Sequence, residues 1–195
     1  MDHVILAILW IIYCVLHSIL AATSLKKKLQ NRFGKNYKFY RLFYTIFSFV
    51  FLIWLIYFQI NMQTYQFYEL GFGILITGLI LSFLGMILMI ICIGKYFVSL
   101  SGLRSLVQES PSSELMIKGI HKHVRHPLYL GTFAFIWGLF LLLPYLSLLI
   151  SNTIITIYTL IGIGLEERKL ELEFGEKYRQ YMSEVPKLLP RLWTK

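Results

Sequence analysis

Charged residues are scarce in this chain. Only 15% of its residues are Asp, Glu, Lys or Arg, whereas 57% are hydrophobic and the mean hydropathy is +0.65. Soluble domains carry about 25% charged residues. A chain of 195 residues cannot hide so much apolar surface inside a globule. The sequence therefore predicts an integral membrane protein, with the lipid bilayer as its solvent.

Cysteine is also rare, and acidic residues are outnumbered by basic ones. Cys14 and Cys92 both lie in apolar runs, so we expect packing roles for them, without a disulfide framework or a thiolate metal site. The net charge is +9, but the basic residues lie between apolar runs and form no basic groove with interleaved aromatics. We therefore expect no nucleic-acid partner. Residues 1–3 contain no Lys or Arg, so the first apolar run is predicted to be a retained span.

Apolar segments alternate with polar connections along the whole chain. The first three each approach the ~20 residues that a helix needs to cross the hydrocarbon core. The last apolar tract is too long for one span, and Pro144 divides it. The sequence thus predicts an all-α, polytopic protein with one integral membrane domain over residues 1–195. Five transmembrane helices are expected over residues 4–22, 42–60, 70–94, 128–143 and 145–165, the last two forming a tight hairpin.

The distribution of Lys and Arg predicts the orientation in the membrane. The connection after the first span is rich in basic residues, for example Lys26, Lys27 and Arg32, and the third connection is also basic. Residues 61–69 and the turn at Pro144 contain no Lys or Arg. Basic connections stay on the cytoplasmic side. We therefore expect the N-terminus outside and the C-terminus inside, in the cytoplasmic membrane of a bacterium, with the functional site facing the cytoplasm.

The charged tail has a helical pattern. Apolar and aromatic residues recur at helical spacing between its charges. The sequence predicts a cytoplasmic amphipathic helix over residues 166–183.

Two polar clusters flank the predicted hairpin. His121–Pro127 precedes its first helix, and Glu166–Lys169 follows its second. Counted from Pro144, the two clusters end at similar depth on the same side of the membrane. One interpretation is a pocket with a cationic and an anionic half. The other is structural, with Arg125 and Glu167 forming an ion pair that pins the hairpin while the remaining cations reach lipid headgroups.

A resemblance favours the pocket. The segments 119–120, 124–131 (Val-Arg-His-Pro-Leu-Tyr-Leu-Gly), 166–168 (Glu-Glu-Arg), 174–181 and 185–190 resemble the isoprenylcysteine carboxyl methyltransferase and phospholipid methyltransferase superfamily. Residues 17–21, 40–44 and 101–104 are similar to its methanethiol methyltransferase-like and NnrU-like branch. The resemblance implies a membrane methyltransferase that uses S-adenosylmethionine and acts on a small or lipophilic acceptor, such as a thiol or an isoprenylcysteine-like carboxylate.

The resemblance also implies which residues would bind the cofactor. Arg125 would hold its carboxylate, and Glu167 would meet its ammonium or sulfonium charge. Tyr129 and His126 would pack on its adenine or ribose. The full expected cofactor set is His123, Arg125, His126, Pro127, Tyr129, Gly131, Glu166 and Glu167. Glu167, His126 and Arg125 are the expected catalytic residues, and either His126 or Glu167 would take the proton of a thiol acceptor. No metal is expected.

Substrate contacts are expected further upstream. His17 lies inside the first span, where a polar ring either lines a site or bonds a neighbouring helix. Tyr40 and Arg41 would gate the substrate or anchor the chain at the interface. Arg104 would cover the cofactor or contact headgroups.

Three other functions compete with the methyltransferase. Nicotinamide-dependent membrane reductases share the Arg-His-Pro region, but their pattern has Asn and Glu where this chain has Leu128 and Thr132. The spacing of His121, His123 and His126 is compatible with zinc, although membrane hydroxylases and desaturases need many more than the five histidines present. A non-catalytic accessory protein on the same scaffold is the third alternative.

Overall fold

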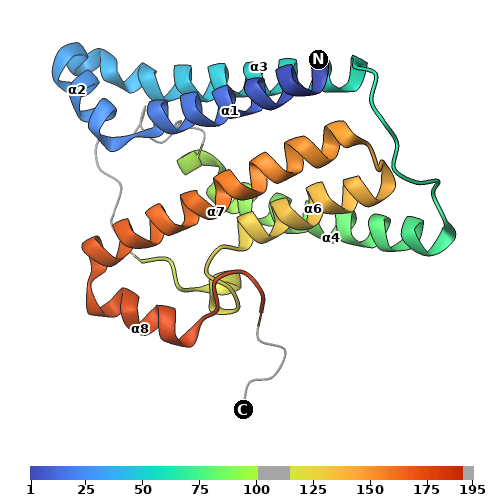
Figure 1. The fold of residues 1–195 in the computed structure, drawn as a ribbon. Coiled ribbons are helices and arrows are strands. Elements are labelled where there is room, and N and C mark those ends of the chain that lie inside the picture. The colour runs from blue at the N-terminus through green and yellow to red at the C-terminus, as the bar shows by residue number, and fades with distance from the viewer. Residues whose placement is uncertain (101–114, 191–195) are drawn as a thin grey trace. The chain divides into compact units, whose positions relative to one another are not determined.

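The structure, a computed structural model, describes residues 1–100 and 115–190. Regular structure in this part of the chain is helical, apart from one isolated bridge between Gln66 and Tyr145. The all-α class predicted from the sequence is confirmed. The elements follow one another as shown in Figure 1: α1 (Asp2–Ala21), α2 (Thr23–Phe33), η1 (Gly34–Tyr37), α3 (Lys38–Asn61), α4 (Phe72–Leu100), η2 (Gly119–Lys122), α6 (Pro127–Leu142), α7 (Leu146–Phe174) and α8 (Glu176–Glu184).

Several of these helices are long and apolar enough to cross a membrane. In the described residues they are α1, Leu42–Asn61 of α3, Phe72–Gly94 of α4, and α7. Helix α6 is apolar but shorter, with 16 residues. The protein is therefore an integral membrane protein, as predicted. The count of five spans and the orientation of the termini stay predictions.

The described residues form two compact units. The first comprises Met1–Phe67, 96–100 and Tyr145–Ile155, and the second comprises Tyr68–Lys95, 115–144 and 156–190. Helix α7 contributes to both, because it continues without a break from one into the other. The single domain expected over residues 1–195 stays a prediction.

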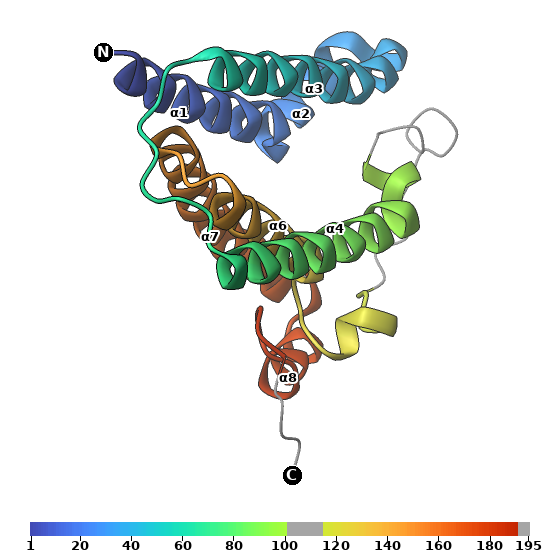
Figure 2. The same cartoon turned by 90° about the vertical axis from the view of Figure 1, so that its right-hand side faces the viewer.

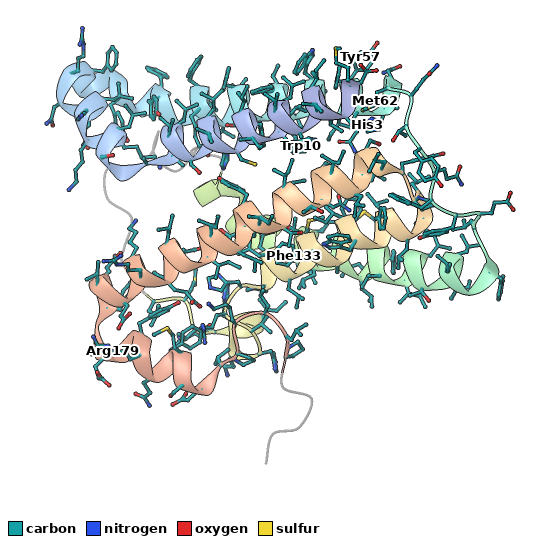
Figure 3. The ribbon with its side chains drawn as sticks, viewed as in Figure 1. His3, Trp10, Tyr57, Met62, Phe133 and Arg179 are labelled. Atoms are coloured by element: carbon teal, nitrogen blue, oxygen red, sulfur yellow. The ribbon has the colours of Figure 1, made fainter. Side chains whose placement is uncertain are left out.

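In the first unit, α1 and α3 run antiparallel, side by side (Figures 1 and 2). Leu6 and Trp10 of α1 pack against Leu55 of α3. The Trp10 indole N–H, in the residue labelled in Figure 3, donates to Gln59 Oε1 (3.1 Å), and Gln59 Nε2 donates to Ser151 Oγ at the start of α7 (3.2 Å). Polar side chains inside a membrane protein need such partners. These bonds connect three helices of the unit.

Helix α2 occupies part of the first basic connection, for which the sequence predicted no helix. Its sequence, TSLKKKLQNRF, contains mostly good helix formers and no proline. The helix ends at Gly34, whose φ of 51° is accessible to glycine at little cost.

In the second unit, α6 packs closely on α4 (Figure 2). A Cβ atom on Gly131 of α6 would lie 3.0 Å from the backbone oxygen of Gly85 of α4, so a side chain there would force the helices apart. Helix α6 ends at Leu142 and α7 begins at Leu146, so the break predicted at Pro144 is confirmed.

The end of α7 differs from the prediction. No separate helix begins at Glu166, because α7 continues through the charged residues to Phe174. Gly175 then bends the chain with a φ of 55°, and α8 follows. On α8, Tyr178 and Tyr181 are buried with Val185, whereas Arg179 lies on the outer surface (Figure 3). The predicted amphipathic helix over 166–183 is therefore two pieces, the last turns of α7 and a short helix α8.

Candidate active site

The contacts of the candidate site lie within the second unit. The segment before α6 is positioned by the segment after α8. The backbone N–H groups of Arg125 and His126 donate to the carbonyl oxygens of Pro186 (2.9 Å) and Lys187 (3.1 Å). Pro127 then begins α6, where the N–H it lacks would have no helical partner. These bonds hold the backbone from which the Arg125 and His126 side chains extend.

Arg125 is bound to protein groups on several sides. Its Nε and Nη2 atoms donate to Glu167 Oε1 at 2.9 and 2.8 Å, and Nη1 donates to the backbone oxygens of Met182 (2.9 Å) and Val185. The Arg125 and Glu167 side chains are only 9% and 11% exposed. The ion pair considered as one interpretation of the sequence is confirmed. Arg125 thus connects α7 to the C-terminal end of α8. A cofactor carboxylate would have to compete with these acceptors for the guanidinium.

Glu167 lies beyond Leu165, where the apolar part of α7 ends and its charged turns begin. Its Oε1 atom also meets His126 Nε2 (3.2 Å), and its Oε2 atom meets Lys187 Nζ (2.9 Å). Burial opposes ionisation of Glu167, but the hydrogen bonds from Lys187 and Arg125 outweigh it and hold its pKa below the usual value. A carboxylate stabilised in this way is a weak proton acceptor.

The two nitrogens of His126 face different carboxylates. Because an ionised carboxylate can only accept, Nε2 carries the hydrogen in the contact with Glu167. The Nδ1 atom lies 3.8 Å from Glu166 Oε2. The His126 ring stacks on Tyr129, with centroids 5.6 Å apart, and the Tyr129 hydroxyl donates to Glu166 Oε2 (3.1 Å). The side chain of Glu166 is 46% exposed, so this carboxylate is far more accessible than that of Glu167.

A cavity of about 190 Å³ opens beside this cluster. Its walls combine apolar and aromatic side chains with two histidines, one arginine and one carboxylate. Small-molecule sites usually measure about 300–1,000 Å³, so this cavity has room for part of a nucleotide-sized cofactor. The lining residues are Leu115, Met116, His121, Arg125, His126, Glu166, Leu170, Phe174, Tyr178 and Tyr181.

Most of the predicted cofactor residues come together in the structure. Arg125, His126, Tyr129, Glu166 and Glu167 form one connected set of contacts. Pro127 begins the helix that carries Tyr129. His123 is exposed and does not line the cavity, and Gly131 packs on α4, where it allows the helices to approach. The catalytic and binding roles of all these residues stay predictions.

Two of the predicted substrate residues, His17 and Tyr40, make their contacts within the first unit. His17 contacts the Tyr44 hydroxyl (3.0 Å to Nε2), and the Tyr40 hydroxyl donates to the backbone oxygen of Leu20 (2.8 Å), all within the first unit. The side chain of Arg41 and the whole of Arg104 fall outside the described residues. The substrate roles of these four residues stay predictions.

Four residues of the site were not among the predicted site residues. The Nδ1 atom of His121 contacts the backbone oxygen of Arg125 (3.1 Å), and the Tyr181 hydroxyl donates to the backbone oxygen of His121 (2.7 Å). Tyr178 lines the same cavity. The helical spacing of the two tyrosines was a usable signal, since it places both on one face of α8. Lys187 follows the last helix, and nothing in the sequence indicated its contact with Glu167.

The histidines do not form a metal site in the described part of the chain. Residues 1–100 and 115–190 contain no group of three or more His, Cys, Asp or Glu side chains placed to hold a metal ion.

Comparisons with known proteins relate this chain to two sets of relatives. Curated relatives include methanethiol S-methyltransferases from Crocosphaera subtropica (39% identical over 77 residues, 38% of this chain and 29% of the relative) and Pseudomonas deceptionensis (43% over 75 residues, 37% and 27%). A protein-S-isoprenylcysteine O-methyltransferase from Schizosaccharomyces pombe is 35% identical over 77 residues, 39% of this chain and 33% of the relative. The match thus spans about a third of the length of these relatives. No solved structure matches.

These relatives confirm the predicted resemblance to the isoprenylcysteine methyltransferase superfamily and its NnrU-like branch. The family match itself covers nearly the whole chain, because the NnrU protein family matches residues 5–185. The chain belongs to the NnrU family.

Proposed function

We propose that this protein is an S-adenosylmethionine-dependent membrane methyltransferase that acts on a small or lipophilic acceptor, such as a thiol or an isoprenylcysteine-like carboxylate. The observation that carries the proposal is the cavity in the second unit, where the half-exposed Glu166 carboxylate stands among aromatic and apolar side chains. The similarity to methanethiol S-methyltransferases and to a protein-S-isoprenylcysteine O-methyltransferase supports methyl transfer.

The residues around the cavity fit the chemistry of this cofactor. A carboxylate next to aromatic rings is a suitable environment for a positively charged, methyl-bearing group. Glu166 would meet the ammonium or sulfonium charge, and the apolar walls from Leu170 and Phe174 would cover the less polar parts. When bound, S-adenosylmethionine supplies a methyl group on a positively charged sulfur, which makes it an electrophile.

His126 is the residue of this chain best placed to take a proton from an acceptor thiol. Its Nε2–H is engaged by Glu167, so the ring nitrogen that can accept a proton is Nδ1. Glu167 holds the ring and its tautomer, as an orienting carboxylate does for a catalytic histidine. The imidazolium formed would have Glu166 Oε2 at 3.8 Å from Nδ1. A thiol deprotonated in this way becomes the nucleophilic thiolate.

Arg125 has a positioning role in this scheme. It holds Glu167 and the end of α8 in place, and Glu167 in turn holds His126. This assignment replaces the direct contact between Arg125 and the cofactor carboxylate expected from the sequence.

A second candidate is a non-catalytic accessory membrane protein on the same scaffold. Two observations favour it, namely the occupation of the Arg125 guanidinium by protein acceptors and the small volume of the cavity. An accessory protein would not bind the cofactor, so a binding measurement separates the two candidates.

The test is calorimetric titration of S-adenosylmethionine into the detergent-purified protein and two variants. Glu166→Gln removes the accessible carboxylate charge without a change of shape. Glu171→Gln makes the same change in α7, at a residue paired with Arg179 and absent from the cavity. We expect the wild type and Glu171→Gln to bind equally, and Glu166→Gln to bind about ten- to a hundredfold more weakly, as for the loss of a charged contact.

A well-folded wild type that releases no heat at millimolar cofactor would refute the proposal in favour of the accessory protein. If the cofactor binds, formation of S-adenosylhomocysteine with methanethiol as acceptor, compared with a prenylated cysteine, identifies the acceptor class.

A further inference from the structure

One polar atom in the wall of the cavity has no partner. Within the described residues, only the hydroxyl groups of Ser82 and Tyr178 are buried side-chain polar atoms without a hydrogen bond. Ser82 faces Gly138 in the contact between α4 and α6. Tyr178 is only 1% exposed, yet it lines the cavity. Buried hydroxyl groups are rarely left unpaired, because they lose their bonds to water on folding.

The ring of Tyr178 has mostly apolar neighbours. The ring packs in an apolar cluster that includes Leu170, Phe174 and Tyr181. The charged or polar side chains of Arg125, Glu166 and His126 line the same cavity. A flat apolar wall with one hydroxyl group matches a purine nucleoside, which is aromatic and carries several hydrogen-bonding atoms. The zwitterionic amino-acid end of the cofactor matches the charged side instead.

We propose that the Tyr178 hydroxyl binds the nucleoside part of S-adenosylmethionine by a hydrogen bond, which makes this cavity the nucleoside subsite. This inference rests on the proposed function. The cavity volume of about 190 Å³ agrees with a subsite that takes part of the cofactor. Burial and then the nearby Glu167 carboxylate raise the pKa of Tyr178 to about 12, so its hydroxyl keeps its proton at neutral pH and can donate.

Because the Tyr178 hydroxyl has no protein partner, its removal can be tested for an effect on ligand binding without a loss of stability. Tyr178→Phe keeps the buried ring and removes only a hydroxyl that bonds nothing in the protein, so the melting temperature without ligand should stay the same or rise. Tyr181→Phe is the matched control on the same wall, since its hydroxyl donates to the backbone oxygen of His121 (2.7 Å). That variant should melt at a lower temperature, because it leaves a carbonyl without its donor.

The experiment measures the affinity of the wild type and Tyr178→Phe for S-adenosylmethionine and for S-adenosylhomocysteine, together with the melting temperatures of both variants. We expect Tyr178→Phe to weaken both ligands by the same factor, about three- to tenfold for one hydrogen bond. The shared factor follows because the two ligands have the same nucleoside.

Each other outcome overturns the inference in a distinguishable way. Equal affinities of wild type and Tyr178→Phe would remove the role of Tyr178 and leave the proposed function standing. A loss for S-adenosylmethionine alone would place the hydroxyl at the sulfonium. A melting temperature of Tyr178→Phe as low as that of Tyr181→Phe would show that the hydroxyl has a structural partner. A wild type that binds neither ligand would refute the proposed function, and this inference with it.

Discussion

Replacement of Glu167 by alanine should destabilise the protein much more than the same replacement at Glu171, four residues later in α7. Glu167 accepts hydrogen bonds from Arg125 and His126 and pairs with Lys187. Glu171 has an ion pair with Arg179 at 2.7 Å, which is as short as any contact of Glu167. The two sites therefore share the chemistry of an acid–arginine pair and differ in burial.

Burial decides the expected magnitude. The Arg125 side chain is 9% exposed, so Glu167→Ala leaves a guanidinium in the interior without its counter-charge. Removal of one partner of a buried pair costs about 3–5 kcal/mol. Arg179 and Glu171 are 59% and 38% exposed, and exposed pairs contribute at most about 1 kcal/mol. With about 2–4 °C per kcal/mol for a chain of this length, Glu167→Ala should lower the melting temperature by roughly 6–20 °C.

The assay is thermal unfolding of the three proteins in the same detergent, followed by intrinsic fluorescence. The variants Arg125→Ala and Arg125→Ala/Glu167→Ala complete a cycle, and the double variant should lose less than the sum of the two single variants, because no buried unpaired charge remains. A shift for Glu167→Ala no larger than that for Glu171→Ala would refute the reasoning. It would mean that Arg125 is stabilised by the carbonyl oxygens of Met182 and Val185 alone.

Two further predictions concern pH and helix packing. The pKa of Glu167 is lower in the folded protein than in the unfolded chain. Its contribution to stability is therefore complete above the ordinary carboxyl pKa of about 4 and is lost as the pH falls through the folded pKa. Between about pH 7 and pH 3, the melting temperature of Glu167→Gln should fall less than that of the wild type, and equal falls for the two proteins would contradict this. Gly131→Ala should lower the free energy of unfolding by about 1–3 kcal/mol, because its Cβ would lie 3.0 Å from the backbone oxygen of Gly85. Gly162→Ala in α7, where no atom lies within 4 Å of the added Cβ, should be neutral or stabilising. Equal melting temperatures of the two variants would exclude the close contact.

Much of the fold could be predicted because hydropathy reports directly on the membrane. The apolar runs predicted the helices α1, α3, α4, α6 and α7, and Pro144 predicted the break between the last two. The helix boundaries differ from the predicted ones where the polarity of the sequence changes but its preference for helix does not. Residues after Leu165 are charged, yet Glu, Arg, Lys and Leu all favour helix, so α7 continues until Gly175. The end of an apolar run therefore need not mark the end of the helix.

In the candidate site, the sequence predicts contacts between side chains but misses contacts with the backbone. The pairing of Arg125 with Glu167 could be predicted, because the hairpin fixes the depth of both side chains. The other acceptors of Arg125 could not be predicted, because they are the backbone oxygens of Met182 and Val185, which any residue at those positions would supply. The same holds for the backbone hydrogen bonds that Arg125 and His126 donate to the carbonyl oxygens of Pro186 and Lys187.

This difference changes what the Arg-His-Pro and Glu-Glu segments mean in this chain. The sequence pattern shows only the possible side-chain partners of Arg125 and so suggests that its guanidinium can bind a ligand. In the structure, Arg125 instead joins α7 to the end of α8. The polar groups that line the cavity and are not held by Arg125 are then the exposed Glu166 carboxylate, the His126 ring and the Tyr178 hydroxyl. A search for the function of this chain should therefore vary those three residues first. Variants of Arg125 and Glu167 would lose activity through loss of structure whether or not either residue ever touches a ligand.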